Sequence, residues 1–564
     1  MPQLGTSMRQ VMPPRRPQLA DLGVFLLVVA LPLVFTPFSL SPFGDPKLVV
    51  LAAGTLALWA SGLTVDRRVA WPAFAWVGIS VAAALAGVDI AVGLTARTEG
   101  QGGGAILIGC AGVLAALGTA LPEGLRERAR RWFVASGVVV AIMGIAVRIF
   151  PDHAGVMPSD IEFIGATIGN QLFAAALMSA ALAAAIVTPG DGERAVGART
   201  VALIAFLALG TATFGERSSI VLPIVAAGAV LWKARLPART AIALASAVLV
   251  PLLAWQVLDS TVFPDTTGRG DAVTGIAAQT TDLQRLATWR AMSRAAAERP
   301  LLGWGPGSAK SGFLVAASPS EVGEAGRQWA DAHNLFIETA TTTGVLGLVA
   351  LVWLVSLLAI RSLRCPPARA WAFGAAAGLA AYSLVEPLGL VLTPLLFFFA
   401  GVAAGPSTAV PATAPRPAWI RRTIFVGVAA LLGVATVVSV QMLAAASLER
   451  WGRTYGETWA LEDALTIQPW RLSARERLAL RWAIDGRAGD EPAAARAREV
   501  IGDAVRAHPW DPDVRFWAAD VETLLRDQVA AAAWVEQQLV RFPADVVTVE
   551  KRSSTDLENT FPGA

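Results

Sequence analysis

The residues best suited to do chemistry lie in one stretch, DAHNLFIETATTTGVLGL, which runs from Asp331 to Leu348. It contains His333, one of three histidines in the chain, then Asn334 and, just over a helical turn further on, Glu338. An imidazole titrates close to neutral pH, so it can accept a proton under ordinary conditions. The apolar residues that follow predict a membrane helix. The stretch therefore predicts a titratable group at the end of such a helix.

Other charged residues also gather at the ends of apolar runs. Arg217 lies in FGERSS, Arg97 in LTARTEG, and Glu386 ends a later run. Ionisable residues within a membrane are costly and usually functional. Each arginine alone is best explained as an interfacial side chain that reaches toward the headgroups. The gathering of these charges on one side predicts a site near the outer leaflet.

A long polar loop precedes His333. TTDLQRLATWRAMSRAAAERP predicts a helix from about Asp282 to Arg299, with a capping box at Thr281 and Gln284 and a stop at Pro300. Arg285 and Trp289 lie four residues apart, on one face of that helix. They therefore become candidate ligand-binding residues.

The next segment, PLLGWGPG, contains Gly303, Gly305 and Gly307. These glycines predict a tight turn whose backbone can approach a ligand closely. The Lys of a nucleotide-binding phosphate loop is out of place here. His153, His333 and His508 are far apart in the sequence, so we predict neither a zinc site nor any other metal site.

Composition predicts that the chain is an integral membrane protein. Of its 564 residues, 55% are hydrophobic and 16% are charged, whereas soluble domains average about 25% charged residues. Runs of about 20 apolar residues are long enough to span a bilayer. Thirteen such runs lie near residues 20–41, 46–65, 69–87, 102–121, 132–150, 163–187, 200–214, 218–232, 240–263, 334–360, 370–387, 389–404 and 423–446. We expect an all-α, polytopic transmembrane helical bundle of about 12–13 spans.

Basic residues predict the orientation of this bundle. With residues 1–19 in the cytoplasm, the inner segments hold 20 lysines and arginines and the short outer loops hold four. Such an asymmetry is typical of multi-pass proteins of the cytoplasmic (inner) membrane. It places loop 264–333 and the region 447–564 on the outer side, with residues 20–446 as the membrane domain.

The region 447–564 is polar enough to be a soluble helical domain. IQPW, AHPWDP and RFPAD recur in it, and Pro509 and Pro543 are 34 residues apart, which is the period of tetratricopeptide repeats. A plain helical domain with proline-marked turns explains the pattern equally well. Both interpretations predict a surface on which a protein could dock.

These motifs together resemble the O-antigen ligase and polymerase family. The resemblance rests on Arg285 with Trp289, on PLLGWGPG at 300–307 and on AHNLFIE with GVLGL at 332–348. DPK at 45–47, GATIGNQ at 165–171 and TFGERSS at 213–219 agree less specifically. The similarity extends over roughly residues 20–404.

The resemblance implies a membrane glycosyltransferase. Such an enzyme moves a glycan from an undecaprenyl-diphosphate-type carrier to a glycan, lipid or protein acceptor on the outer face of the cytoplasmic membrane, without a cofactor, a metal or nucleic acid. His333 would be the general base and the transfer would invert the anomeric carbon. The implied diphosphate- or substrate-binding residues are Arg217, Arg285, Arg97, Trp289, Gly303, Gly305, Asn334 and Glu338.

Three functions stay open at this point. The first is an O-antigen ligase or a protein O-glycosylase, and the second is a glycan polymerase of the same family. The third is a non-enzymatic transporter, which should have broken helices with polar residues near the middle of the membrane.

Overall fold

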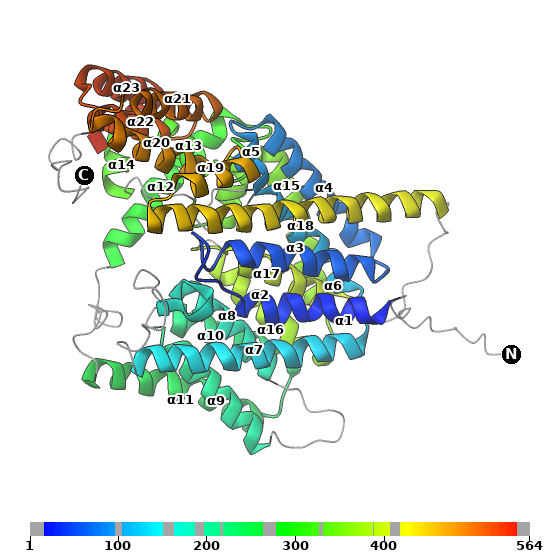
Figure 1. Cartoon of the computed structure of the whole chain (residues 1–564). Coiled ribbons are helices and arrows are strands. Elements are labelled where there is room, and N and C mark those ends of the chain that lie inside the picture. Colours follow the sequence, from blue (N-terminus) through cyan, green and yellow to red (C-terminus); the bar gives the residue numbers. More distant parts are fainter. Residues whose placement is uncertain are drawn as a thin grey trace.

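The computed structural model describes residues 16–95, 104–149, 163–186, 197–214, 218–262, 278–325, 331–386, 388–406, 418–546 and 548–549. Within these ranges the chain contains helices and turns and no strand. The predicted all-helical, polytopic architecture is therefore confirmed (Figure 1).

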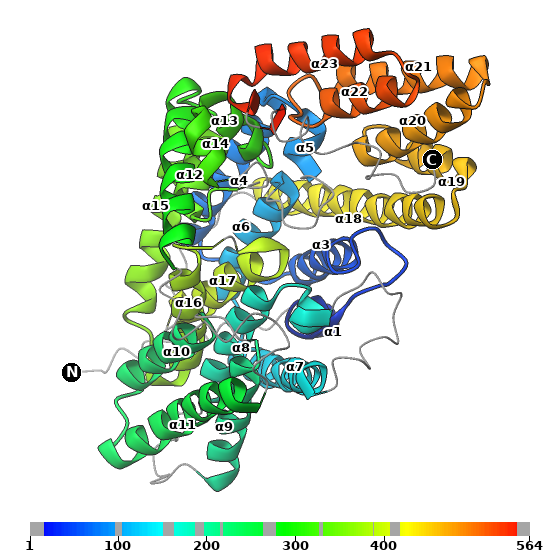
Figure 2. The same cartoon turned by 90° about the vertical axis from the view of Figure 1, so that its left-hand side faces the viewer.

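Each of the thirteen apolar runs contains helical structure, and these helices form one bundle (Figures 1 and 2). In chain order they are α1 Pro17–Phe25 with η1 Leu26–Ala30 and α2 Leu31–Leu33, α3 Asp45–Ala60, α4 Arg67–Ala86, α6 Ala105–Thr119, α7 Glu123–Ile149, α8 Gln171–Ala185, α9 Ala198–Ala212, α10 Ser218–Ala234, α11 Ala238–Val262, α15 Leu335–Ser362, α16 Ala370–Tyr382, α17 Gly389–Ala404 and α18 Ala418–Tyr455. Short helices α5 Ile90–Thr95, η3 Phe163–Ile168 and η4 Pro367–Arg369 connect them.

Among the described residues, five helices are long and apolar enough to cross a membrane by themselves. They are Arg67–Ala86, Glu123–Ile149, Ala238–Leu258, Leu335–Ser362 and Arg422–Tyr455. Shorter apolar helices of 10–17 residues, such as Gln171–Ala185 and Gly389–Ala404, lie among them. The chain is thus a multi-pass helical protein, and its exact number of crossings and its orientation stay predictions.

The described part of loop 264–333 folds into three helices, α12 Ala278–Glu298, α13 Ala309–Ala316 and α14 Pro319–Ala325. The helix predicted from Asp282 to Arg299 therefore exists, and it ends before Pro300 as expected. It begins at Ala278, so the capping box predicted at Thr281 is wrong: Thr281 lies within the helix.

Helix α15 is broken at Gly344, whose φ of 67° and ψ of −171° are not helical. PLLGWGPG supplies partners for the backbone groups at this break. Thr341 O and Thr342 O accept from the N–H groups of Trp304 and Gly305 at 3.0 and 2.9 Å. On the other side, Val345 N–H donates to Pro300 O at 2.7 Å. Residues 335–343 thus form a short half-helix that the loop attaches to the rest of α15.

The C-terminal region is helical, with α19 Thr458–Ile467, α20 Leu472–Arg487, α21 Glu491–Ala507, α22 Val514–Leu524, α23 Gln528–Arg541 and η5 Pro543–Asp545. These helices lie beside α12, α13 and α14 at one end of the bundle (Figure 1). The domain boundary predicted at residue 447 falls inside α18, which continues to Tyr455 and ends before Gly456 (φ 72°). The buried ion pair between Glu449 and Arg471 joins the end of α18 to the start of α20.

Candidate active site

The predicted base lies in a short turn, Asp331–Asn334, directly before α15. Asn334 caps this helix: its Oδ1 accepts from the N–H groups of Phe336 and Ile337 at 3.0 and 3.1 Å. Its Nδ2 donates to the carbonyl of Leu384 at 2.9 Å. Asparagine is a preferred N-cap residue because its short side chain can reach these N–H groups. Asn334 therefore fixes the start of α15 and connects it to the turn after α16.

His333 is held by the aspartate two residues before it. Its N–H donates to Asp331 Oδ1 at 2.9 Å, and its Nδ1 lies 2.7 Å from the same oxygen. The backbone of His333 has a φ of 48°, which is uncommon for a residue other than glycine. Such a conformation persists only where its surroundings enforce it, as happens at many functional sites.

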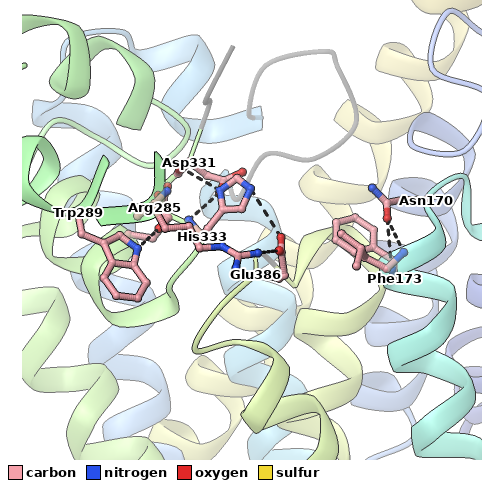
Figure 3. A network of polar contacts seen from close by, with 10 residues as sticks. Asn170, Phe173, Arg285, Trp289, Asp331, His333 and Glu386 are labelled. Atoms are coloured by element: carbon pink, nitrogen blue, oxygen red, sulfur yellow. Dashed lines mark hydrogen bonds and ion pairs between the residues drawn. The ribbon is translucent and has the colours of Figure 1, made fainter. Parts of the chain in front are cut away.

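The other ring nitrogen of His333 faces a second carboxylate. Nε2 lies 3.6 Å from Glu386 Oε2, which is longer than a hydrogen bond. Glu386 also forms an ion pair with Arg285 of α12. Leu335 N–H donates to Ser383 O at 2.9 Å and so ties the turn that carries Glu386 to the start of α15. The site is thus a row in which His333 lies between Asp331 and Glu386, with Arg285 on Glu386 (Figure 3).

Trp289 and Glu338 fix the backbone of Ala332, the residue just before His333. The indole Nε1 of Trp289 donates to Ala332 O at 2.7 Å, and Ala332 N–H donates to Glu338 Oε2 at 2.8 Å. Both residues were predicted to bind substrate. In the structure their polar atoms contact the backbone, so they position His333.

The electrostatic surroundings of His333 favour its protonated form. Burial alone would lower the pKa of the imidazole, because it disfavours the charged form. The hydrogen bond and the negative charge of Asp331, together with the charge of Glu386, outweigh this effect and raise the pKa above its usual value. His333 is therefore a stronger base than a free imidazole, and it becomes neutral at a higher pH.

Gly303 and Gly305, which were predicted to approach a ligand, lie against other backbone segments of the protein. Their φ angles are 67° and 101°, so the expected glycine turn exists. A Cβ at Gly303 would lie 2.5 Å from Thr341 O, and one at Gly305 would lie 3.2 Å from the Cα of Gly87. Gly303 therefore lies close to the backbone of α15, and Gly305 lies close to the backbone of the turn after α4. The structure gives these two glycines a structural role, and their role in substrate binding stays a prediction.

The two other predicted arginines, Arg217 and Arg97, lie outside the described residues. Their flanking elements are described: α10 begins at Ser218, and α5 ends at Thr95. Helix α10 packs closely against α16. A Cβ built on Gly378 of α16 would lie only 3.0 Å from the Cβ of Ala226 of α10. Helices α10 and α16 run in opposite directions, so the first turn of α10 is near the level of the last turn of α16. That turn leads directly to Glu386.

The weaker sequence motifs form a separate structural cluster. Asn170 caps α8 by accepting from the N–H groups of Leu172 and Phe173 at 2.8 and 3.3 Å (Figure 3). Lys47 is buried, and its Nζ donates to the carbonyl of Thr167 at 2.6 Å. DPK and GATIGNQ thus contact each other and fix the approach of the chain to α8.

Sequence reasoning did not select Asp331 or Glu386 as site residues. Both signals were present: Asp331 opens the quoted stretch, and Glu386 is an acid at the end of an apolar run. Asp331 is close to His333 in the sequence, whereas the proximity of Glu386 depends on the fold, because the turn after α16 is hydrogen-bonded to the start of α15.

Comparison with known proteins gives one family match. Residues 200–352 match the family described as O-Antigen ligase. The matched segment includes α9–α15 up to residue 352, and with them Arg285, Trp289, PLLGWGPG and His333. The search of curated proteins found no match.

Proposed function

Because residues 200–352 match the family described as O-Antigen ligase, we propose that this multi-pass protein is a glycosyltransferase with a lipid-linked donor. It moves a glycan from an undecaprenyl-diphosphate-type carrier to a hydroxyl acceptor on the outer face of the cytoplasmic membrane. The observation that carries the proposal is the row of Asp331, His333, Glu386 and Arg285 at the start of α15.

His333 is the proposed general base. Asp331 occupies Nδ1, so Nε2 is the nitrogen that accepts the proton of the acceptor hydroxyl. The hydroxyl oxygen then forms a bond to the anomeric carbon, and the bond from that carbon to the phosphate oxygen breaks. The electron pair leaves with the lipid diphosphate. This is one displacement at carbon, and it inverts the configuration.

Arginines balance the charge of the departing diphosphate. A guanidinium stays charged at all relevant pH values and can bond phosphate oxygens in pairs. Arg285 is the described candidate, with Glu386 orienting it through their ion pair. Arg217 is the second candidate, because the neighbouring Ser218 begins a helix that packs on α16. This arrangement requires no metal, so chelators should leave the transfer unchanged.

Glycan polymerase is the principal alternative, and a protein acceptor is a variant of the ligase. The same base and the same diphosphate contacts serve all three, so only the product separates them. A transporter is disfavoured by the pairing at Gly344, since the backbone groups at the break in α15 bind the loop 300–305.

The test is transfer by the purified protein in liposomes that contain an undecaprenyl-diphosphate-linked glycan and a candidate acceptor. His333→Ala should lower the transfer rate by about 10²–10⁴-fold, the usual contribution of a general base. Donor binding should persist, because other residues contact the diphosphate. Arg285→Lys should weaken donor binding, because lysine lacks the planar pair of donors.

Normal transfer by His333→Ala would refute the catalytic assignment. Normal donor binding by an Arg217→Ala, Arg285→Ala double variant would remove the arginines from the diphosphate site. A product that lengthens by repeat units would establish the polymerase in place of the ligase.

A further inference from the structure

The C-terminal helices contact the most specific motif of the outer loop. Trp510, in the turn after α21, packs edge to face against Trp304 of PLLGWGPG, with ring centroids 5.8 Å apart and an interplanar angle of 75°. Arg299 lies over both rings, at 4.7 Å from the centroid of Trp304 and 5.8 Å from that of Trp510. Arg541 covers Trp510 at 4.1 Å. We call this group the Trp304–Trp510 contact.

Polar and apolar pairs surround this contact. Lys310 of α13 forms an ion pair with Asp513 at 2.8 Å, and His508 pairs with Asp89 in the turn after α4. Phe542 is fully buried in the same apolar cluster as residues of α12, α13 and α14. The C-terminal helices therefore contact the loop on several sides.

Trp304 connects this contact to the half-helix that follows His333. Its ring is almost fully buried, and its Nε1 donates to Ala295 O of α12 at 2.9 Å. Its N–H donates to Thr341 O at 3.0 Å, at the end of residues 335–343. A shift of Trp304 would therefore displace both α12, which carries Arg285 and Trp289, and the half-helix.

We infer that the C-terminal helices position the active site through the Trp304–Trp510 contact, with Trp510 as a positioning residue. The inference rests on the proposed function, because it assumes that His333 and Arg285 do the chemistry. It gives residues 458–545 a role in the rate of transfer, in addition to any role in binding a protein partner.

The chain offers a matched control in Trp470. IQPW follows α19 as AHPW follows α21, so the two tryptophans occupy equivalent turns. Trp470 is exposed, whereas Trp510 is half-buried against Trp304 and Arg541. A general effect of removing a tryptophan from this domain should appear at both positions, and an effect of the contact should appear at Trp510 alone.

The first measurement is glycan transfer with the full-length protein. Trp510→Ala should lower kcat by about tenfold, because the aromatic pair and the arginine contacts that hold Trp304 in place are lost. The KM for the donor should change less, because Trp510 does not touch the diphosphate site. Trp510→Phe, which keeps an aromatic edge for Trp304, should restore most of the rate, and Trp470→Ala should match the wild type.

A second measurement reports on the loop without using activity. Hydrogen exchange of the amides of residues 301–305 and 341–345 should speed up in Trp510→Ala and stay unchanged in Trp470→Ala. Faster exchange with an unchanged kcat would overturn the positioning role. Inactivity of the wild type with every lipid-linked donor would instead refute the proposed function, whatever the exchange data show.

A charge reversal tests the docking geometry independently. Lys310→Asp places two carboxylates together and should reproduce the faster exchange and lower kcat of Trp510→Ala. Asp513→Lys in the same chain restores opposite charges and should recover both values at least in part. Absence of any change in Lys310→Asp would overturn the inference that this surface is joined to the loop.

Discussion

Two histidine–aspartate pairs lie at the same end of this molecule and differ in almost every other respect. In one, His333 Nδ1 is 2.7 Å from an aspartate two residues away, and the side chains are 22% and 17% exposed. In the other, His508 pairs with Asp89, 419 residues distant, and the side chains are only 4% and 9% exposed. The first pair lies within a single turn, and the second joins two domains.

The second ring nitrogen shows what each pair can do. His333 Nε2 faces Glu386 at 3.6 Å and lies near Arg285, which pairs with that acid. His508 Nε2 is buried without a hydrogen-bond partner among the described residues. A base needs a nitrogen that substrate can reach. A histidine–aspartate pair alone therefore does not identify a catalytic site. Access to Nε2 distinguishes His333 from His508.

The same substitution in both pairs should have very different effects on transfer. Asparagine can donate to the neighbouring aspartate, and it tolerates the positive φ found at His333 better than most residues. His333→Asn should fold normally and lose transfer by about 10²–10⁴-fold. His508→Asn should lose less than about tenfold, through a weaker domain contact. Equal losses in the liposome transfer assay would erase the functional difference between the two pairs.

The next test uses pH, because Asp331 and Glu386 raise the pKa of His333. The base must be neutral to accept a proton, so transfer should fall as pH decreases through a midpoint above about 6.5, the ordinary imidazole value. Asp331→Asn removes one negative charge and should move that midpoint down. Asp89→Asn should leave the midpoint unchanged.

A pH–rate series on the three proteins, with donor in excess, checks this prediction. A midpoint that moves upward in Asp331→Asn would contradict the assigned role of the aspartate. A rate that falls toward high pH would instead assign His333 as a protonated phosphate ligand, with Glu386 as the base.

The smallest predicted effect concerns the tryptophan that holds the peptide before His333. Trp289→Phe keeps the ring and removes the Nε1 donor to Ala332 O. Loss of one hydrogen bond of this kind costs about 0.5–1.5 kcal/mol, so kcat should fall by about 2–10-fold. Binding of the donor should not change, and a large loss of donor affinity would make Trp289 a substrate contact as first predicted.

The sequence predicted the helices of the bundle well, because a long apolar run has few alternatives to a helix, whereas the number of membrane crossings stays a prediction. The helix that carries Arg285 and Trp289 was also predicted, with its end correctly set by Pro300 and its start missed by four residues. Cap positions are hard to assign from sequence when, as here, polar residues extend beyond the first candidate. The helix begins at Ala278, before the residues that carry the capping pattern.

The site was predicted in part. His333 follows from its type and place, whereas Glu386 depends on the pairing of the turn after α16 with the start of α15, which no local pattern encodes. The glycines illustrate a different limit. Their positive φ angles were predictable from residue type, but whether they approach a ligand or another backbone segment is decided only by what the fold places beside them.

The break at Gly344 has a consequence for the order in which this protein is made. Residues 300–305 leave the ribosome before residues 341–346, so the loop has to wait for its backbone partners until α15 has been synthesised. The half of α15 after the break, 18 residues and about 27 Å long at 1.5 Å per residue, is long enough to be inserted as a membrane segment by itself. Trp510 is synthesised more than 160 residues later. The loop motif therefore acquires its Trp510 neighbour only after α15, α16, α17 and α18 have all been synthesised.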